Sequence, residues 1–238
     1  MDNAGYTALT RQSGLLQEMQ TVANNIANLA TTGFRKEGLI FSEHVHALEN
    51  GDPSLSMATA NARATDRIQG PLSQTGGSFD FAIEGVGFFQ IETPDGNQIT
   101  RAGAFTPSAD GELVTNDGYR LLDVGGAPIF IPPDGGKINV SADGTLSVDG
   151  FALSQIGLFE PADMHGLSRR DGVRFAVTGD LNPVEDGVIL QGYLENSNVN
   201  AVGEIARMIE VQRAYELGQQ ILDKEDERIR GVLQALGR

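Results

Sequence analysis

Two histidines at alternate positions are the residues best suited to metal chemistry in this 238-residue chain. His44 and His46 would lie on one side of a β-strand, where two imidazoles could hold a metal ion. The third histidine, His165, lies in a distant polar segment, so no third ligand is evident. We therefore interpret the pair as solvated, expect no metal site, and identify no Ser-His-Asp catalytic arrangement.

Asp-Gly dipeptides offer a second possible chemistry, calcium binding. Calcium-binding loops carry further carboxylates at alternate positions, whereas here each aspartate stands nearly alone. Asp and Gly both tolerate positive φ, so the dipeptides indicate tight turns. Eight occur, beginning at Asp95, Asp110, Asp117, Asp134, Asp143, Asp149, Asp171 and Asp186.

Two glycine-rich segments do not fit nucleotide binding. Gly85-Val86-Gly87 lacks the third glycine of the dinucleotide fingerprint and continues into a strand pattern. Residues 135–138 lack the Ser or Thr and the helix that a phosphate loop needs. No convergent carboxylates are indicated, so we expect no cofactor and no catalysis. The remote alternative is an acidic β-domain that binds glycan or acts as a cell-wall enzyme.

Composition narrows the class of protein further. The chain has no cysteine, which excludes disulfides and thiolate sites. Its net charge is −15, of which −14 falls in residues 41–198, and this acidic surplus argues against nucleic-acid binding. No apolar run approaches the ~20 residues of a membrane span, and residues 1–5 lack the features of a signal peptide. Alone, these features predict a cytoplasmic protein without membrane insertion.

The two ends of the chain carry apolar stripes at alternating three- and four-residue spacing, the pattern of paired helices in a coiled coil. A helix covering the C-terminal stripe would be ~50 Å long at ~1.5 Å per residue. We expect the stripes to pair with each other, with neighbouring copies, or with both. The N-terminal seam is Ala8, Gln12, Leu15, Met19, Val22, Ile26 and Leu29, and the C-terminal seam is Met208, Val211, Tyr215, Gly218, Leu222, Glu225, Ile229, Val232 and Leu236.

Polar residues mark the ends of these helices. The first helix is expected over residues 4–31, with Gly33 just past its end. Within it, Asn24 and Asn28 lie one turn apart. They indicate either a fraying last turn or polar contacts that fix register with a partner helix. Ser197 or Asn198 is expected to cap the second helix.

Between the helices the pattern changes to β. Short apolar runs separated by turns predict a β-rich sandwich or irregular barrel, so the fold class is α+β. Residues 161–172 are expected to form a loop, and the basic residues Arg35, Lys36, Arg63 and Arg67 to lie on the surface. The expected division is an N-terminal coiled-coil helix at 1–33, an extended connector with short strands at 34–78, a β-rich central domain at 79–190, and a C-terminal coiled-coil helix at 191–238.

Three blocks of sequence resemble the flagellar basal-body rod and hook protein family. The sequence of residues 24–35, NNIANLATTGFR, is similar to the family's N-terminal signature. Residues 82–89 with 100–105 resemble its central block, and residues 191–199 with 208–216 resemble its C-terminal block. The blocks occur in family order along the whole chain.

The resemblance implies a structural subunit of a hollow helical rod that transmits torque and passes exported subunits. It implies export through the flagellar type III apparatus without a cleaved signal peptide, a position in the periplasmic basal body, and other rod proteins as partners. A proximal-rod subunit is the best match, and a distal-rod or hook subunit is the alternative. We expect both termini to be largely disordered in the free monomer and to fold on docking. The expected assembly interface is Leu15, Met19, Val22, Asn24, Asn25, Ile26, Asn28, Leu29, Met208, Val211, Tyr215, Leu222, Ile229, Val232 and Leu236.

Overall fold

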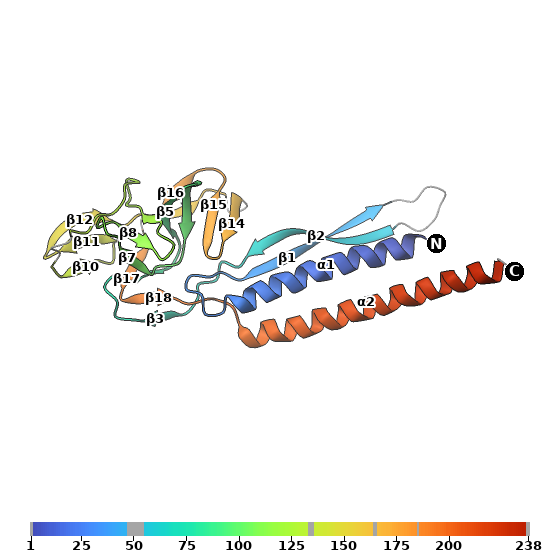
Figure 1. The fold of residues 1–238 in the computed structure, drawn as a ribbon. Coiled ribbons are helices and arrows are strands. Elements are labelled where there is room, and N and C mark those ends of the chain that lie inside the picture. The colour runs from blue at the N-terminus through green and yellow to red at the C-terminus, as the bar shows by residue number, and fades with distance from the viewer. Residues whose placement is uncertain (1, 47–54, 133–135, 164–165, 185, 237–238) are drawn as a thin grey trace. The chain divides into compact units, whose positions relative to one another are not determined.

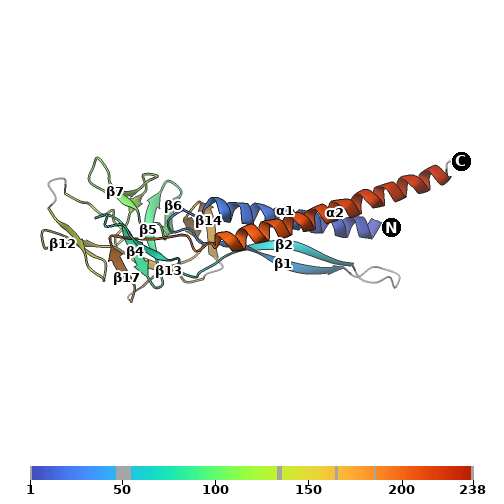
Figure 2. The same ribbon diagram turned by 90° about the horizontal axis from the view of Figure 1, so that it is seen from below.

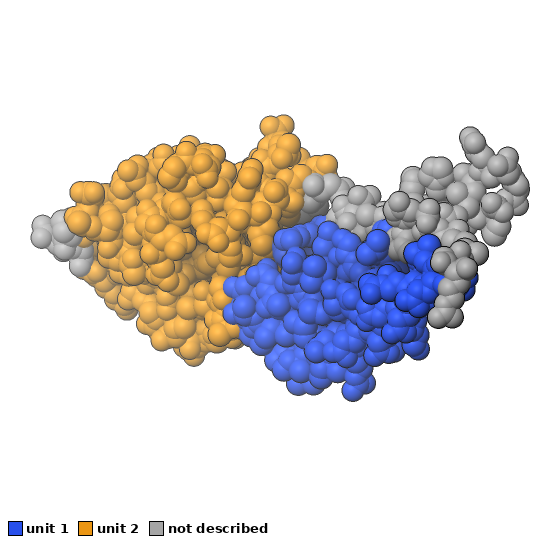
Figure 3. All heavy atoms as spheres, turned by 45° about the vertical axis from the view of Figure 1, so that its right-hand side comes forward, with its two compact units in different colours: residues 1–29, 36–66, 199–238 blue, residues 30–35, 67–198 orange. Residues whose placement is uncertain are grey.

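The computed structural model describes residues 2–46, 55–132, 136–163, 166–184 and 186–236. The chain folds as two compact units, which Figure 3 shows in different colours. Unit 1 comprises residues 1–29, 36–66 and 199–238, and unit 2 comprises residues 30–35 and 67–198.

Unit 1 contains both long helices and one β-hairpin. These are α1 (Asp2–Ala27), β1 (Glu37–His46), β2 (Leu55–Thr65) and α2 (Ala201–Leu236). Helix α1 packs against α2 on one face and against the hairpin on another, and it lies between them in Figure 1. The predicted helix at each end of the chain is therefore confirmed.

Helix α1 ends at Ala27, four residues before its expected end. The Asn28 side chain donates a hydrogen bond to the backbone oxygen of Asn24 at 2.9 Å, and its backbone N–H donates to the same oxygen at 3.2 Å. An asparagine amide that takes a helix carbonyl in this way competes with the next helical turn. Gly33 then adopts a φ of +70°, which turns the chain away from the helix direction.

Strands β1 and β2 have 10 and 11 residues, longer than the short strands expected for this segment. They pair antiparallel from Glu37 opposite Thr65 to His46 opposite Leu55, with an irregularity between Ile40 and Phe41. The interpretation of His44 and His46 as a solvated pair concerns side chains outside the described part of the structure.

Unit 2 is built from short strands, as its turn-rich sequence predicts. They are β3 (Leu72–Gln74), β4 (Phe81–Glu84), β5 (Phe88–Thr93), β6 (Gly96–Thr100), β7 (Phe105–Pro107), β8 (Leu113–Thr115), β9 (Arg120–Leu121), β10 (Ile138–Val140), β11 (Thr145–Val148), β12 (Phe151–Gln155), β13 (Leu158–Pro161), β14 (Leu167–Asp171), β15 (Arg174–Val177), β16 (Leu181–Pro183), β17 (Val188–Gln191) and β18 (Tyr193–Glu195).

The main sheet of unit 2 has the strand order β14-β15-β6-β5-β9-β8-β7, with β13 pairing to β5 and β16. Among the described strands this order does not return to its start, so the sheet is not closed into a barrel. Smaller sheets combine β10-β11-β12, β17 with β4, and β18 with β3. The pairs β17-β4 and β18-β3 join strands from the C-terminal part of unit 2 to strands near its N-terminal part.

The core of unit 2 is apolar and aromatic. Phe81, Phe89 and Ile91 are fully buried in it, and the rings of Phe89 and Phe105 meet edge to face with centroids 5.6 Å apart. Such pairs add specificity to the burial of apolar area. The core therefore fixes β4, β5 and β7 against one another.

Six of the eight Asp-Gly segments form turns, as predicted, while Asp134-Gly135 lies outside the described residues and Asp186-Gly187 forms a bend without positive φ. Glycines with positive φ follow Asp95, Asp110, Asp117, Asp143, Asp149 and Asp171. At Asp149 and Gly150 the φ values are 50° and 86°, which makes a two-residue turn between β11 and β12.

The prediction of a loop at residues 161–172 was wrong, because β14 forms there and pairs with β15. Its polar residues suit a strand that pairs on one side only.

Candidate assembly interface

The two helices of unit 1 run antiparallel. Gln12 Nε2 donates to the backbone oxygen of Tyr215 at 2.9 Å, and Arg207 contacts Glu18 Oε1 at 2.5 Å. Later residues of α1 therefore face earlier residues of α2. The Glu18 carboxylate raises the pKa of Arg207 above its usual value, chiefly through its hydrogen bond, while burial opposes the shift.

The predicted seams face each other along part of this helix pair. Val22 and Val211 are buried, and each contributes ~1.5–3 kcal/mol relative to full exposure. Half-buried seam residues on both helices flank them, and the exposed Asn24 lies outside this packing. The half-buried set is Leu15, Met19, Ile26, Asn28, Leu29, Met208, Tyr215 and Leu222.

The C-terminal seam continues past the beginning of α1. Because Gln12 lies opposite Tyr215, the first residues of α1 lie near residue 225, and α2 continues to Leu236. Figures 1 and 2 both show α2 extending beyond the N-terminal end of α1. Ile229 and Val232 of the seam are each 47% exposed, and the side chain of Leu236 is outside the described residues. The seam is thus covered only in part by its own chain.

Asn25, rather than Asn24 or Asn28, makes the buried polar contacts of α1 within the chain. Its side chain is 1% exposed and donates to the Glu37 backbone oxygen at 2.8 Å and to Glu204 Oε2 at 3.0 Å. The Glu37 N–H donates back to Asn25 Oδ1 at 2.9 Å. Asn25 therefore ties α1 to both β1 and α2. The amide of Asn28 instead bonds to Asn24.

Glu204 completes this polar site. It lies in the first turn of α2, is 3% exposed, and forms an ion pair with Lys36 Nζ at 2.6 Å. A carboxylate in the first turn is favoured by the helix dipole. Asn200 caps this helix through its side-chain oxygen, which accepts from Gly203 N–H at 2.9 Å, so neither of the expected caps is used.

A buried charge cluster in unit 2 was missed from the sequence. Arg35, expected on the surface, is 2% exposed, and its guanidinium contacts Glu195 Oε1 at 2.9 Å. Arg101 contacts the other oxygen of Glu195 at 3.2 Å. Burial lowers the pKa of Arg101 to about 10, while the Glu195 carboxylate opposes this shift. The signal available in the sequence was that each of the three residues belongs to a different family-like block.

Gly33 brings two of these blocks into close backbone contact. A Cβ placed on Gly33 would lie 2.3 Å from the backbone nitrogen of Ala102, so no larger residue fits without a shift. The Gly33 N–H donates to the Glu195 backbone oxygen at 2.7 Å. The N-terminal, central and C-terminal blocks thus meet at one place in unit 2.

Comparisons with known proteins match the same three regions of the chain, the N-terminal, central and C-terminal blocks. Residues 6–35 match the flagella basal body rod protein family, and residues 82–148 match the flagellar hook protein FlgE/F/G D1 domain. Residues 190–235 match the flagellar basal body rod FlgEFG protein C-terminal family. A flagellar basal-body rod protein FlgF of Caulobacter vibrioides is 40% identical over 100% of this chain and 99% of its own.

The chain belongs to the flagellar basal-body rod protein family. A FlgF protein of Mesorhizobium japonicum is 38% identical over 97% of this chain and 98% of its own. A basal-body rod protein FlgG of Buchnera aphidicola is 34% identical over 91% of this chain and 93% of its own. The rod family is structural and not enzymatic, and its members form part of the flagellar basal body together with other rod and hook components.

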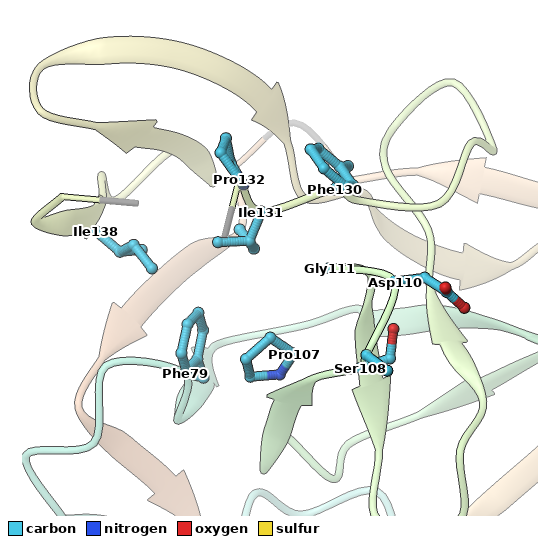
Figure 4. Close-up of a pocket in the computed structure, with 10 residues that line it drawn as sticks. Phe79, Pro107, Ser108, Asp110, Gly111, Phe130, Ile131, Pro132 and Ile138 are labelled. Carbon is cyan, nitrogen blue, oxygen red and sulfur yellow. The ribbon is translucent and has the colours of Figure 1, made fainter. Parts of the chain in front are cut away.

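One pocket in the described part of this rod-family chain has a lining with few groups suited to catalysis. It lies in unit 2, holds about 450 Å³, and is lined mainly by apolar side chains such as Phe79, Ile131 and Ile138 (Figure 4). Asp110 is the one titratable residue in its described lining. Hydrolysis of glycosidic bonds uses a pair of carboxyl groups, which this lining does not offer.

The described part of the chain holds no group of three or more His, Asp or Glu side chains that could bind a metal ion. None of its helices combines the length and the apolar character needed to cross a bilayer.

Proposed function

We propose that this chain is a subunit of the proximal rod and joins neighbouring rod subunits through its terminal helices. The observation that carries the proposal is the C-terminal seam, which continues past α1 and leaves Ile229 and Val232 half exposed. An apolar stripe of this kind is stabilised when another helix covers it in a coiled coil. A subunit that joins its neighbours head to tail, with a rotation that does not close, builds an open helical filament, and the proposed rod is a hollow filament of this kind.

We propose that the interface residues expected from the sequence, from Leu15 to Leu29 and from Met208 to Leu236, form the contacts between subunits. Val22 of α1 and Val211 of α2 are already buried within the chain. They therefore support the interface indirectly, by stabilising the packing of α1 on α2. Ile229 and Val232, each 47% exposed, are placed to meet a neighbour directly, and Leu222 and Leu236 stay in the proposed interface as seam residues. In the rod, Asn24 would contribute its exposed amide.

The subunit leaves the cytoplasm through the flagellar type III export apparatus without a cleaved signal peptide, and it is located in the periplasmic part of the basal body. There it transmits torque and lines the path of exported subunits. Both termini are largely disordered in the free monomer and order on docking, because the part of the C-terminal seam that extends past α1 gains cover only from neighbours. Amide exchange on a demonstrated monomer tests this point. Strong protection across residues 8–29 and 208–236 would contradict it.

A distal-rod subunit is the second candidate, since FlgG proteins are 31–34% identical to this chain over most of its length. The FlgF proteins, at 37–40%, favour the proximal rod. The two candidates differ in position. Labelled subunit located by electron microscopy near the membrane-proximal end of isolated basal bodies would support the proximal rod, and label at the distal end would contradict it.

A further inference from the structure

Residues 30–35 contact unit 2 as a short peptide contacts a receptor. These six residues belong to unit 2, although the residues on both sides of them, up to Leu29 and from Lys36, belong to unit 1. The residues that hold them come from much later in the sequence, including Arg101, Arg169 and Glu195. The segment is therefore bound by tertiary contacts alone, with none of the strand pairing that holds its surroundings together.

Three consecutive residues of this segment are each recognised by a different physical means. Gly33 is selected by close approach, because its backbone lies against that of Ala102. Phe34 is 1% exposed, and the guanidinium of Arg169 lies 4.6 Å from its ring centre. Arg169 lies at the same distance from the ring of Phe175, which places it between the two rings.

Arg35 is recognised by charge. Its guanidinium forms the ion pair with Glu195 Oε1 and donates to the backbone oxygens of Arg67, at 3.1 Å, and Ile68. The Arg35 backbone oxygen accepts from Arg169 at 2.6 Å. Charge-assisted hydrogen bonds of this number give geometric selectivity for arginine over a shorter or neutral side chain.

The charge balance of the site allows it to open. Glu195 also accepts from the Gly70 N–H at 2.9 Å and pairs with Arg101, so it keeps a partner for each oxygen after Arg35 leaves. The cluster of two arginines and one glutamate then becomes a neutral pair. Loss of Glu195 has the opposite effect, because it leaves two buried guanidinium groups without their carboxylate.

We propose that unit 2 carries a binding site for the Gly-Phe-Arg sequence of residues 33–35, and that docking of this segment is a reversible latch that makes the subunit competent for assembly. The latch closes only on a folded unit 2, because its receptor residues come from separate strands and turns. It also fixes the segment that follows α1 to the segment that precedes α2, since Phe34 O accepts from Asn198 N–H at 3.3 Å. The link to assembly rests on the proposed function, whereas the binding site itself does not.

The binding site is tested on the full-length chain carrying Phe34→Ala and Arg35→Ala, which leaves the receptor residues intact. A fluorescent peptide of residues 29–36 is added and its anisotropy is followed. We expect it to bind this variant at least tenfold more tightly than the wild type, whose site is occupied. A peptide with Gly33→Ala should lose at least tenfold in affinity. Equal binding to variant and wild type, or equal binding of the two peptides, would overturn the proposal.

A second measurement needs no peptide and covers the case in which the double variant fails to fold. In the Arg35→Met chain, we expect amide exchange at Gly33 to rise at least tenfold while exchange at Leu113, in the core of unit 2, stays unchanged. Arg170→Met, at an exposed position of unit 2 that makes none of the contacts described for the site, is the matched control and should change neither. A uniform rise across unit 2, or no change at Gly33, would contradict a latch. If the latch opens in Arg35→Met and rods still assemble normally, its link to assembly is wrong, whereas the binding site stands.

Discussion

The side chain of Gln12 in α1 occupies the space beside Gly218 in α2. A Cβ on Gly218 would lie 2.4 Å from Gln12 Nε2, the same atom that donates to the Tyr215 backbone oxygen. Glycine inside a helix costs about 1 kcal/mol relative to alanine. The close approach of the two helices gives a physical reason for this glycine, and the chain offers a second helical glycine, Gly231, with no atoms within 4 Å of its Cβ position.

Substituting these two glycines should therefore have different effects. Gly231→Ala should stabilise α2 by about 1 kcal/mol, since it gains helix propensity in open space. Gly218→Ala should lose that gain, because the new methyl group displaces Gln12 from its hydrogen bond. Thermal loss of helix, followed by circular dichroism on rods purified with each variant, measures both. The double change Gln12→Ala with Gly218→Ala should recover part of the loss, and equal stabilisation by the two single changes would contradict the packing.

Asn25 should be the important asparagine of the cluster within the chain. Asn25→Ala removes hydrogen bonds to Glu37 and Glu204 in a buried site, and an unsatisfied buried polar group costs about 1–3 kcal/mol. Asn24→Ala, at an exposed position, should cost less than about 0.5 kcal/mol. Denaturant-induced dissociation of rods purified with each variant makes the comparison, because α1 is ordered there. Similar losses from the two would show that the buried contacts do not determine stability.

Ile229 allows assembly to be separated from folding. Ile229→Asp should leave unit 2 folded, because Ile229 lies in unit 1 and its side chain is 47% exposed, yet it should abolish incorporation into rods. Each seam contact covered by a neighbour is worth up to about 1.5–3 kcal/mol, and the loss is repeated at every subunit. Incorporation is measured by immunoblot of isolated basal bodies. Gln234→Asp is the control, since it adds the same charge at an exposed position outside the seam. Normal rods from Ile229→Asp would mean that the seam is misassigned.

The pKa of Asp143 should be lower than usual, because the backbone N–H and the hydroxyl of Thr145 both donate to its carboxylate. A depressed folded pKa means that this turn contributes stability above the usual value of 3.8, and that the contribution is lost as pH falls through the folded pKa. Thr145→Val should raise the pKa by removing the hydroxyl. Carbon-13 NMR titration of the aspartate carboxyl groups measures the change. An unchanged pKa in the variant would contradict this cause.

The sequence predicted what depends on periodicity and local turn chemistry. Heptad spacing gave a helix at each end, and Asp-Gly turns gave a β-rich middle, because both patterns reflect short-range backbone preferences. The end of α1 was misplaced by four residues, since apolar spacing continued through Leu29 while the Asn28 amide had already taken a helix carbonyl. The polar strand β14 was hidden for a related reason: it pairs on one side and needs no apolar alternation.

Long-range polar contacts could not be predicted in the same way. Nothing in the local pattern around Arg35 distinguishes a buried guanidinium from an exposed one, because its partner Glu195 lies far along the chain. The same holds for Asn25 and Glu204. The family resemblance identified the sequence blocks that contain Arg35, Asn25 and Glu195, but not the contacts that these residues make. Only the fold places Arg35 and Asn25 in separate polar sites, one in each unit.

The most direct test of the account places a photo-crosslinking amino acid at Val232, in the part of the C-terminal seam that extends past α1. Basal bodies are isolated, irradiated, and analysed by mass spectrometry. Rod assembly through this seam predicts covalent products that join position 232 to the terminal helices of a neighbouring rod subunit. Products confined to the same chain, with rods fully assembled, would contradict it.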